Sequence, residues 1–115
     1  MDIQDANKII AEYMGFKIVS DGISELIEGP SGTLRILKGT YSNSLDALVP
    51  VWEKLEEVNV FVNRFAPHGK FVELCSDKKG KDYLPWDCFH YHKHEGTTIQ
   101  EAACIATAKA IKELE

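Results

Sequence analysis

The segment 88–95 holds the residue types that are best suited to chemistry. It reads Cys-Phe-His-Tyr-His-Lys-His-Glu, and three of the four histidines of the chain follow each other in it at a spacing of two: His90, His92 and His94. In an extended strand alternate residues share one face, so Cys88 and the three histidines would lie on the same side. Imidazole and thiolate are typical ligands of Zn²⁺ and similar divalent transition metals. The spacing predicts a metal site, to which Glu95 or Asp87 would add a carboxylate.

A second interpretation places the same histidines in a polar, solvent-exposed loop that leads toward Thr97, with no metal. It is supported by the lack of a second group of ligands upstream, because His68 stands alone between Pro67 and Gly69 in a predicted turn. We prefer this interpretation, under which the protein needs no cofactor.

The cysteines predict free thiols. The chain has an odd number of cysteines: Cys75, Cys88 and Cys104. They have no C-x-x-C spacing and lie in apolar runs, which argues against disulfides. We therefore expect buried thiols in a reducing compartment. Nucleophilic catalysis by Cys75 or Cys88 with a histidine is a weaker alternative, because apolar surroundings keep a thiol protonated.

Aromatic residues crowd the same strand and its approach. The four are Tyr83, Trp86, Phe89 and Tyr91. On an edge strand they cannot all be buried, so either a helix covers them or they form a surface for a protein partner or for a second copy of the chain. We favour the interpretation that most of these four aromatic side chains are buried.

Composition limits the class of partner. With 115 residues, 44% of them hydrophobic and 27% charged, the chain predicts one globular domain over 1–115. A net charge of −5 argues against nucleic acid and anionic membranes, although a small basic group remains at Lys78, Lys79 and Lys81. No window holds 18 consecutive apolar residues and the first residues are acidic, so we expect neither a membrane span nor a signal peptide, and a cytoplasmic protein.

Hydrophobic periodicity and turn residues then predict the elements that position these residues. Helices are expected over about 2–14, capped by Asp2 and ended by Gly15, over about 45–55 with a kink or a new start at Pro50, and from Thr97 or Thr98 to the end of the chain. Strands are expected over 16–19, 23–28, 33–38, 58–65, 70–75 and 83–91. This order predicts an α+β domain, with one antiparallel or mixed sheet of about 4–6 strands covered by three helices, as in an αβα sandwich.

Three stretches also carry a resemblance to a family. They are Ile-Ala-Glu-Tyr-Met-Gly-Phe at 10–16, Tyr-Ser-Asn-Ser-Leu-Asp-Ala-Leu at 41–48, and Thr-Ile-Gln-Glu-Ala at 98–102 leading into Ala106 and Ala110. Together they resemble small phage and prophage proteins with a phage ABA sandwich domain. The resemblance implies a helix, sheet, helix sandwich encoded by a mobile element, and it implies no activity. Pro50 and the histidine-rich strand depart from the pattern of that family.

Two functional hypotheses follow. The first is a non-enzymatic module, encoded by a phage or prophage, that binds a protein or itself through the last strand. The second is a metal-binding domain or metal-dependent hydrolase built on His90, His92 and His94. The lack of a complete set of carboxylate and histidine ligands favours the first.

Overall fold

The computed structural model describes residues 2–20, 25–29, 32, 34–66, 68–69, 71–76, 87–92 and 98–114, and of 76 and 87–92 it describes the backbone alone. These residues form the following elements in chain order: α1 (Ile3–Tyr13), β1 (Lys17–Ser20), β2 (Glu25–Glu28), β3 (Leu34–Ile36), α2 (Leu45–Glu56), β4 (Val60–Ala66), β5 (Phe71–Ser76), β6 (Asp87–His92) and α3 (Ile99–Glu113). The α+β class and the three helices are confirmed. None of the described helices is long and apolar enough to cross a bilayer.

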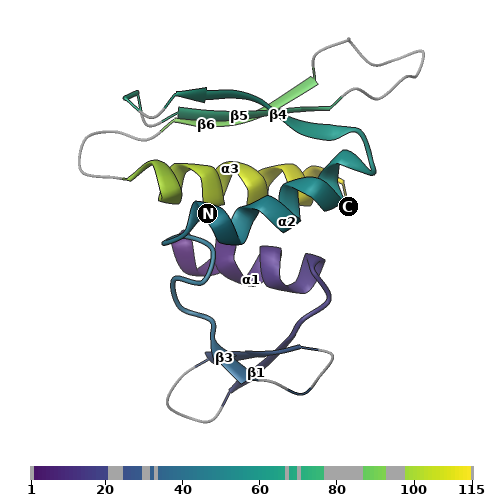
Figure 1. Ribbon diagram of the computed structural model, residues 1–115, viewed down its shortest axis with the longest axis vertical. Helices are drawn as coiled ribbons and strands as arrows, with labels where there is room; N and C mark the ends of the chain where they lie inside the picture. The colour runs from purple at the N-terminus through teal and green to yellow at the C-terminus, as the bar shows by residue number, and fades with distance from the viewer. Residues whose placement is uncertain are drawn as a thin grey trace.

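The strands form two sheets, which corrects the prediction of one sheet of 4–6 strands. Described strands pair antiparallel in the orders β1-β2-β3 and β4-β5-β6. Figure 1 shows the resulting layers: the β4-β5-β6 sheet, then α2 and α3, then α1, then the β1-β2-β3 sheet. The helices therefore lie between two sheets, where the sequence predicted a sheet covered by helices. Each strand pairs with a close neighbour in sequence, and the helical layers keep the two sheets apart.

Helix α3 is the centre of the molecule because it packs on β5 and β6 on one side and on α1 on the other. Its buried residues lie all round the helix: Ala102, Ala103, Cys104, Ile105, Ala106, Thr107, Ala108, Ala110 and Ile111. Small side chains let neighbouring layers approach on both sides. Thr98 begins the helix by accepting a hydrogen bond from the Glu101 amide at 3.1 Å, which selects one of the two predicted capping registers.

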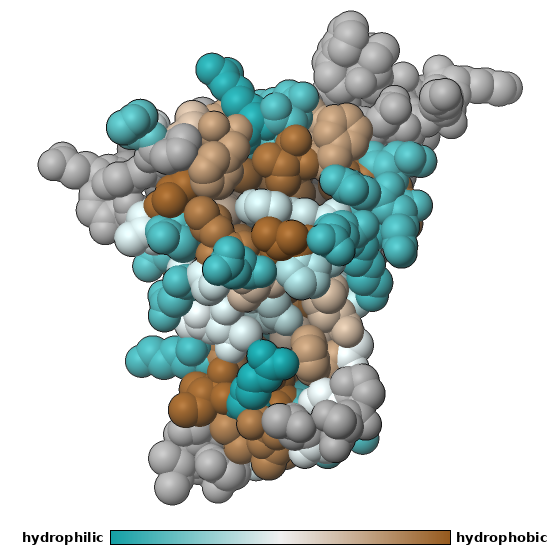
Figure 2. Space-filling view, in the orientation of Figure 1, coloured by the Kyte–Doolittle hydropathy of each residue, from teal (hydrophilic) through white to brown (hydrophobic). Residues whose placement is uncertain are grey.

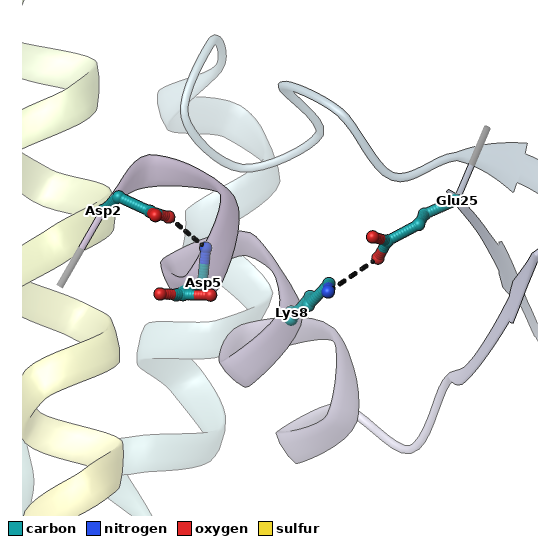
Figure 3. Close-up of polar contacts among 4 residues, drawn as sticks. All are labelled: Asp2, Asp5, Lys8 and Glu25. Atoms are coloured by element: carbon teal, nitrogen blue, oxygen red, sulfur yellow. Dashed lines mark hydrogen bonds and ion pairs between the residues drawn. The ribbon is translucent and has the colours of Figure 1, made fainter. Parts of the chain in front are cut away.

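Helix α1 begins and ends as predicted. The carboxylate of Asp2 accepts a hydrogen bond from the Asp5 amide at 2.8 Å (Figure 3). Gly15 ends the helix with a φ of 87°, a conformation that glycine adopts without a steric penalty.

Asn7 was not foreseen as a core residue, yet it is fully buried in the face of α1. Its Nδ2 donates to the Ile3 carbonyl at 2.9 Å and to Ser42 Oγ at 3.1 Å, and its Oδ1 accepts from the Tyr41 amide at 2.8 Å. One side chain thus ties α1 to the turn that precedes α2.

Helix α2 continues through Pro50, so the predicted alternative of a new helix that begins there is wrong, while a kink at Pro50 stays a prediction. Proline removes only the hydrogen bond to the carbonyl of Asp46, and both residues are exposed, so water can satisfy that carbonyl. Trp52 Nε1 then donates to Thr107 Oγ1 on α3 at 2.9 Å. Lys54 donates to the Tyr13 carbonyl and lies over the Tyr13 ring, 4.3 Å from its centroid. Helix α2 is in this way attached to both other helices.

The two sheets each turn one face toward the helices. In the β4-β5-β6 sheet that face carries the buried Val60, Val72 and Leu74, and a register irregularity lies between Val62 and Arg64. In the β1-β2-β3 sheet it carries the buried Ile27.

The β1-β2-β3 sheet is also joined to α1 by an ion pair. Figure 3 shows Lys8 of α1 beside Glu25 of β2, with Lys8 Nζ 3.0 Å from Glu25 Oε2. The hydrogen bond and the negative charge of Glu25 raise the pKa of Lys8. The two side chains are 37% and 35% exposed, so this ion pair contributes little to stability.

Candidate functional site

Strand β6 brings part of the predicted metal cluster to one face of a sheet. Its backbone pairs with β5 so that Cys88 is opposite Cys75, His90 opposite Glu73 and His92 opposite Phe71. The predicted alternation of these residues along an extended strand is confirmed for Cys88, His90 and His92. His94 and Glu95 lie outside the described residues.

Cys75 corrects the prediction that all three cysteines are free thiols, because it is disulfide-bonded. Cys104 is a free, buried thiol, and the third cysteine, Cys88, is the register partner of Cys75. Residues directly opposite each other on antiparallel strands have Cα atoms about 4.5–5.5 Å apart, within the range that a disulfide requires. The spacing of cysteines in the sequence does not reveal such a pairing, which depends on the strand register. A bonded Cys75 also removes one basis for expecting a reducing compartment.

The carboxylate of Glu73 lies beside the bonded Cys75. Cys75 Sγ is 3.7 Å from Glu73 Oε1, and because a disulfide sulfur carries no proton, this is a contact and not a hydrogen bond. Asn63 Nδ2 donates to the same oxygen at 2.9 Å. Residues 73 and 75 lie on the face turned away from the helices, since the intervening Leu74 belongs to the core. We call this face the outer face of β5 and β6.

Two phenylalanines and an arginine are also described on the outer face or beside it. Phe61 of β4 is the register partner of Cys75 and is 37% exposed, while Cys75 itself is only 4% exposed. The Arg64 guanidinium lies 5.7 Å from the centroid of the Phe71 ring. Among the side chains that the structure describes, no three His, Cys, Asp or Glu residues lie close enough together to hold a metal ion. The site predicted from His90, His92 and His94 stays a prediction.

The predicted aromatic surface falls mainly outside the described residues. Tyr83 and Trp86 are not described, as is true of Lys78, Lys79 and Lys81. The register places Phe89 opposite Leu74 and Tyr91 opposite Val72, two residues that are fully buried. An interaction surface made of these four aromatic residues stays a prediction.

An apolar surface that the sequence reasoning missed lies on the β1-β2-β3 sheet. Val19, Leu34 and Ile36 are 36%, 54% and 63% exposed. Val19 pairs with Leu26, and Leu26 pairs with Ile36, so these residues share the face opposite to Ile27. Leu34, two positions before Ile36 on the same strand, lies on that face as well. Figure 2 shows hydrophobic surface at this end of the molecule.

The same face also carries one pair of opposite charges. Lys17 pairs with Glu28, and Glu28 pairs with Leu34. We call the set of Lys17, Val19, Leu26, Glu28, Leu34 and Ile36 the β1-β3 outer face. A signal for it was present in the sequence, because β1 and β2 each carry two consecutive apolar residues, which must lie on opposite faces.

A hollow of about 520 Å³ lies between α1 and the end of α3, lined by Ile9, Glu12, Tyr13, Ile111, Lys112 and Leu114. Burial raises the pKa of Tyr13, and the negative charge of Glu57 adds to the effect. The phenol therefore stays neutral at ordinary pH.

Cys104 is inert as a nucleophile. Burial raises the pKa of its thiol to about 12, and the negative charge of Glu101 acts in the same direction. The thiolate, which is the reactive form, is therefore almost absent at neutral pH.

Comparisons with protein-family models, with curated proteins and with solved structures found no match. The resemblance to phage ABA sandwich proteins therefore stays a prediction.

Proposed function

We propose that this protein is a non-enzymatic binding module that self-associates through the β1-β3 outer face. The observation that carries the proposal is the exposure of Leu34 and Ile36, which are 54% and 63% exposed on a sheet whose other face already packs on α1. An antiparallel sheet with one covered face usually presents polar residues on the other. A sheet that is apolar on both faces is typical of one that is covered on both.

A second copy of the chain is the occupant that the charges favour. Two copies with a net charge of −5 repel each other, so they associate best through a surface without net charge. The β1-β3 outer face carries one lysine and one glutamate, Lys17 and Glu28, beside its apolar residues. A two-fold axis that runs between β1 and β2 along this face would place Lys17 of one copy near Glu28 of the other, and the symmetry would repeat that contact.

The proposal also includes the first hypothesis from the sequence, a protein-binding module of phage or prophage origin. The module would be encoded by a phage or prophage and would act in the cytoplasm of the host, as the resemblance implies. The aromatic residues Tyr83, Trp86, Phe89 and Tyr91 are a second predicted surface, available for a different protein partner.

The test is the mass of the untagged protein in solution, measured by light scattering over a range of concentrations. A chain mass of 12.9 kDa predicts a dimer near 2 × 12.9 = 25.8 kDa. Ile36→Lys places a charge in the interface of each copy. Burying one isoleucine contributes about 1.5–3 kcal/mol, and the interface holds two, so the dissociation constant should rise about 100-fold or more.

Val49→Lys is the matched control. Val49 is 43% exposed on α2, away from the β1-β3 outer face, so this variant should dimerise as the wild type does. A wild-type chain that stays monomeric at high concentration would refute the proposal, as would equal weakening by both variants. Circular dichroism of Ile36→Lys should match the wild type, because the substituted side chain is largely exposed.

A further inference from the structure

We infer that the outer face of β5 and β6 is a redox-dependent metal site: reduction of a Cys75–Cys88 disulfide yields two thiols, which lose their protons as they bind one Zn²⁺ or similar divalent ion together with Glu73 and His90. The argument begins with register. Two successive cross-strand pairs, Cys75 with Cys88 and Glu73 with His90, occupy neighbouring positions on the same face. All four residues are of types that ligate zinc.

The spacing of these positions suits a single ion. Cβ atoms of cross-strand pairs lie about 4.5–5.5 Å apart, and residues two apart on a strand are separated by about 6.7 Å. Ligand atoms that bind zinc through sulfur and carboxylate oxygen, at about 2.3 and 2.0 Å, are about 3.5 Å from each other in a tetrahedron. Cys75 Sγ and Glu73 Oε1 are already 3.7 Å apart. Two of the four ligand atoms thus have the separation that the ion needs.

Glu73 is held by a hydrogen bond of the kind that orients the carboxylate ligands of metal sites. Asn63 Nδ2 donates to Glu73 Oε1 at 2.9 Å and holds the carboxylate beside Cys75. Cys75 is only 4% exposed, so a metal bound there would be shielded from water on the side of the sulfur.

Register also selects among the predicted histidines. His90 is opposite Glu73, whereas His92 is opposite Phe71, whose ring lies near the Arg64 guanidinium. Phenylalanine has no atom that can bind a metal, and Arg64, which lies near that ring, is also the register partner of Glu73, so its charge does not separate the two positions. Of the two histidines that the register places, His90 is therefore the one opposite a carboxylate, while His94 lies outside the described residues.

The chemistry balances with a thiol reductant. Two molecules of a small thiol transfer two electrons and two protons to the protein disulfide: its S–S bond breaks, both cysteines become thiols, and the small thiol becomes its own disulfide. Binding of the divalent ion then displaces the two thiol protons to solvent. Oxidation reverses the sequence and releases the ion. This site is on the other sheet from the proposed dimer face, so neither proposal depends on the other.

The test is a titration of the untagged, chelated full-length chain with Co²⁺, before and after reduction with a phosphine. Reduced protein should bind one Co²⁺ per chain, with the sulfur-to-cobalt charge-transfer absorption of a tetrahedral thiolate site, and Zn²⁺ should displace it. Oxidised protein should show neither signal. Peptide mapping of the oxidised protein should find Cys75 joined to Cys88.

His90→Ala should weaken Co²⁺ binding by about 10-fold or more, and Glu73→Gln should weaken it measurably. His92→Ala is the matched control, from the same strand and the same face, and should leave the affinity unchanged. Equal loss in His90→Ala and His92→Ala would overturn the inference, and so would binding that ignores reduction. Absence of binding by the reduced protein, or unfolding on reduction as judged by circular dichroism, would overturn it as well.

Discussion

Replacing the buried Asn7 should destabilise the fold more than any single substitution of a surface residue. Asn7→Ala removes the acceptor of the Tyr41 amide and both donations of Nδ2, to Ile3 and to Ser42. Asn7 is 0% exposed and Ser42 is 3% exposed, so water does not reach the groups left behind without a change in structure. The variant tests whether this one amide holds α1 to the turn before α2.

The expected loss follows from the groups left without partners. Each buried polar group that loses its partner costs about 1–3 kcal/mol, and two such groups remain, the Tyr41 amide and the Ser42 hydroxyl. We expect a loss of about 2–6 kcal/mol in the free energy of unfolding. For a chain of this size that lowers the melting temperature by about 8–24 °C.

Urea denaturation followed by circular dichroism measures this loss, and two further variants calibrate it. Ser42→Ala removes only the Nδ2 to Oγ hydrogen bond and should cost about 0.5–1.5 kcal/mol. Glu12→Ala, at an exposed position of the same helix, should change stability by less than about 0.5 kcal/mol. The reasoning is refuted if Asn7→Ala costs no more than Ser42→Ala, since water would then have replaced the amide.

Two other predictions concern helix α3. Thr107→Val keeps the shape of the side chain but removes the acceptor of Trp52 Nε1, and it should cost about 1–2 kcal/mol in urea denaturation. In a double-mutant cycle with Trp52→Phe the two losses should not add, and strict additivity would contradict the role of this hydrogen bond. Cys104 should make stability fall as pH rises, because its thiol is protonated in the folded state up to a pKa of about 12 but ionises near 9.0 when unfolded. The contribution is complete below pH 9 and is lost above it at up to about 1.4 kcal/mol per pH unit. In Cys104→Ala the free energy of unfolding should fall less steeply between about pH 8 and 10 than in the wild type. Identical slopes in the two proteins would contradict the assigned role of the Cys104 thiol.

Local chemistry in the sequence was sufficient to place the elements. Helix α1 with its cap at Asp2 and its end at Gly15, the start of α3 at one of the two predicted caps, and the extended form of β6 were all predicted and are confirmed. These signals depend on residues three or four apart in a helix or two apart in a strand, so the neighbours that decide them are visible in the sequence.

Contacts between distant segments decided the rest. Division into two sheets, the disulfide at Cys75, the burial of Asn7 and the exposure of Ile36 all depend on which surfaces meet once the elements pack. The same alternation along β3 fits a strand in one large sheet or in a small separate one. Cys75 and Cys88, with twelve residues between them in the chain, come opposite each other only through the register of β5 and β6. The sequence by itself determined the elements and their ends, because those follow from local backbone energetics. Only the tertiary structure decided their arrangement and the make-up of both candidate sites, because pairing and burial are properties of the assembled layers.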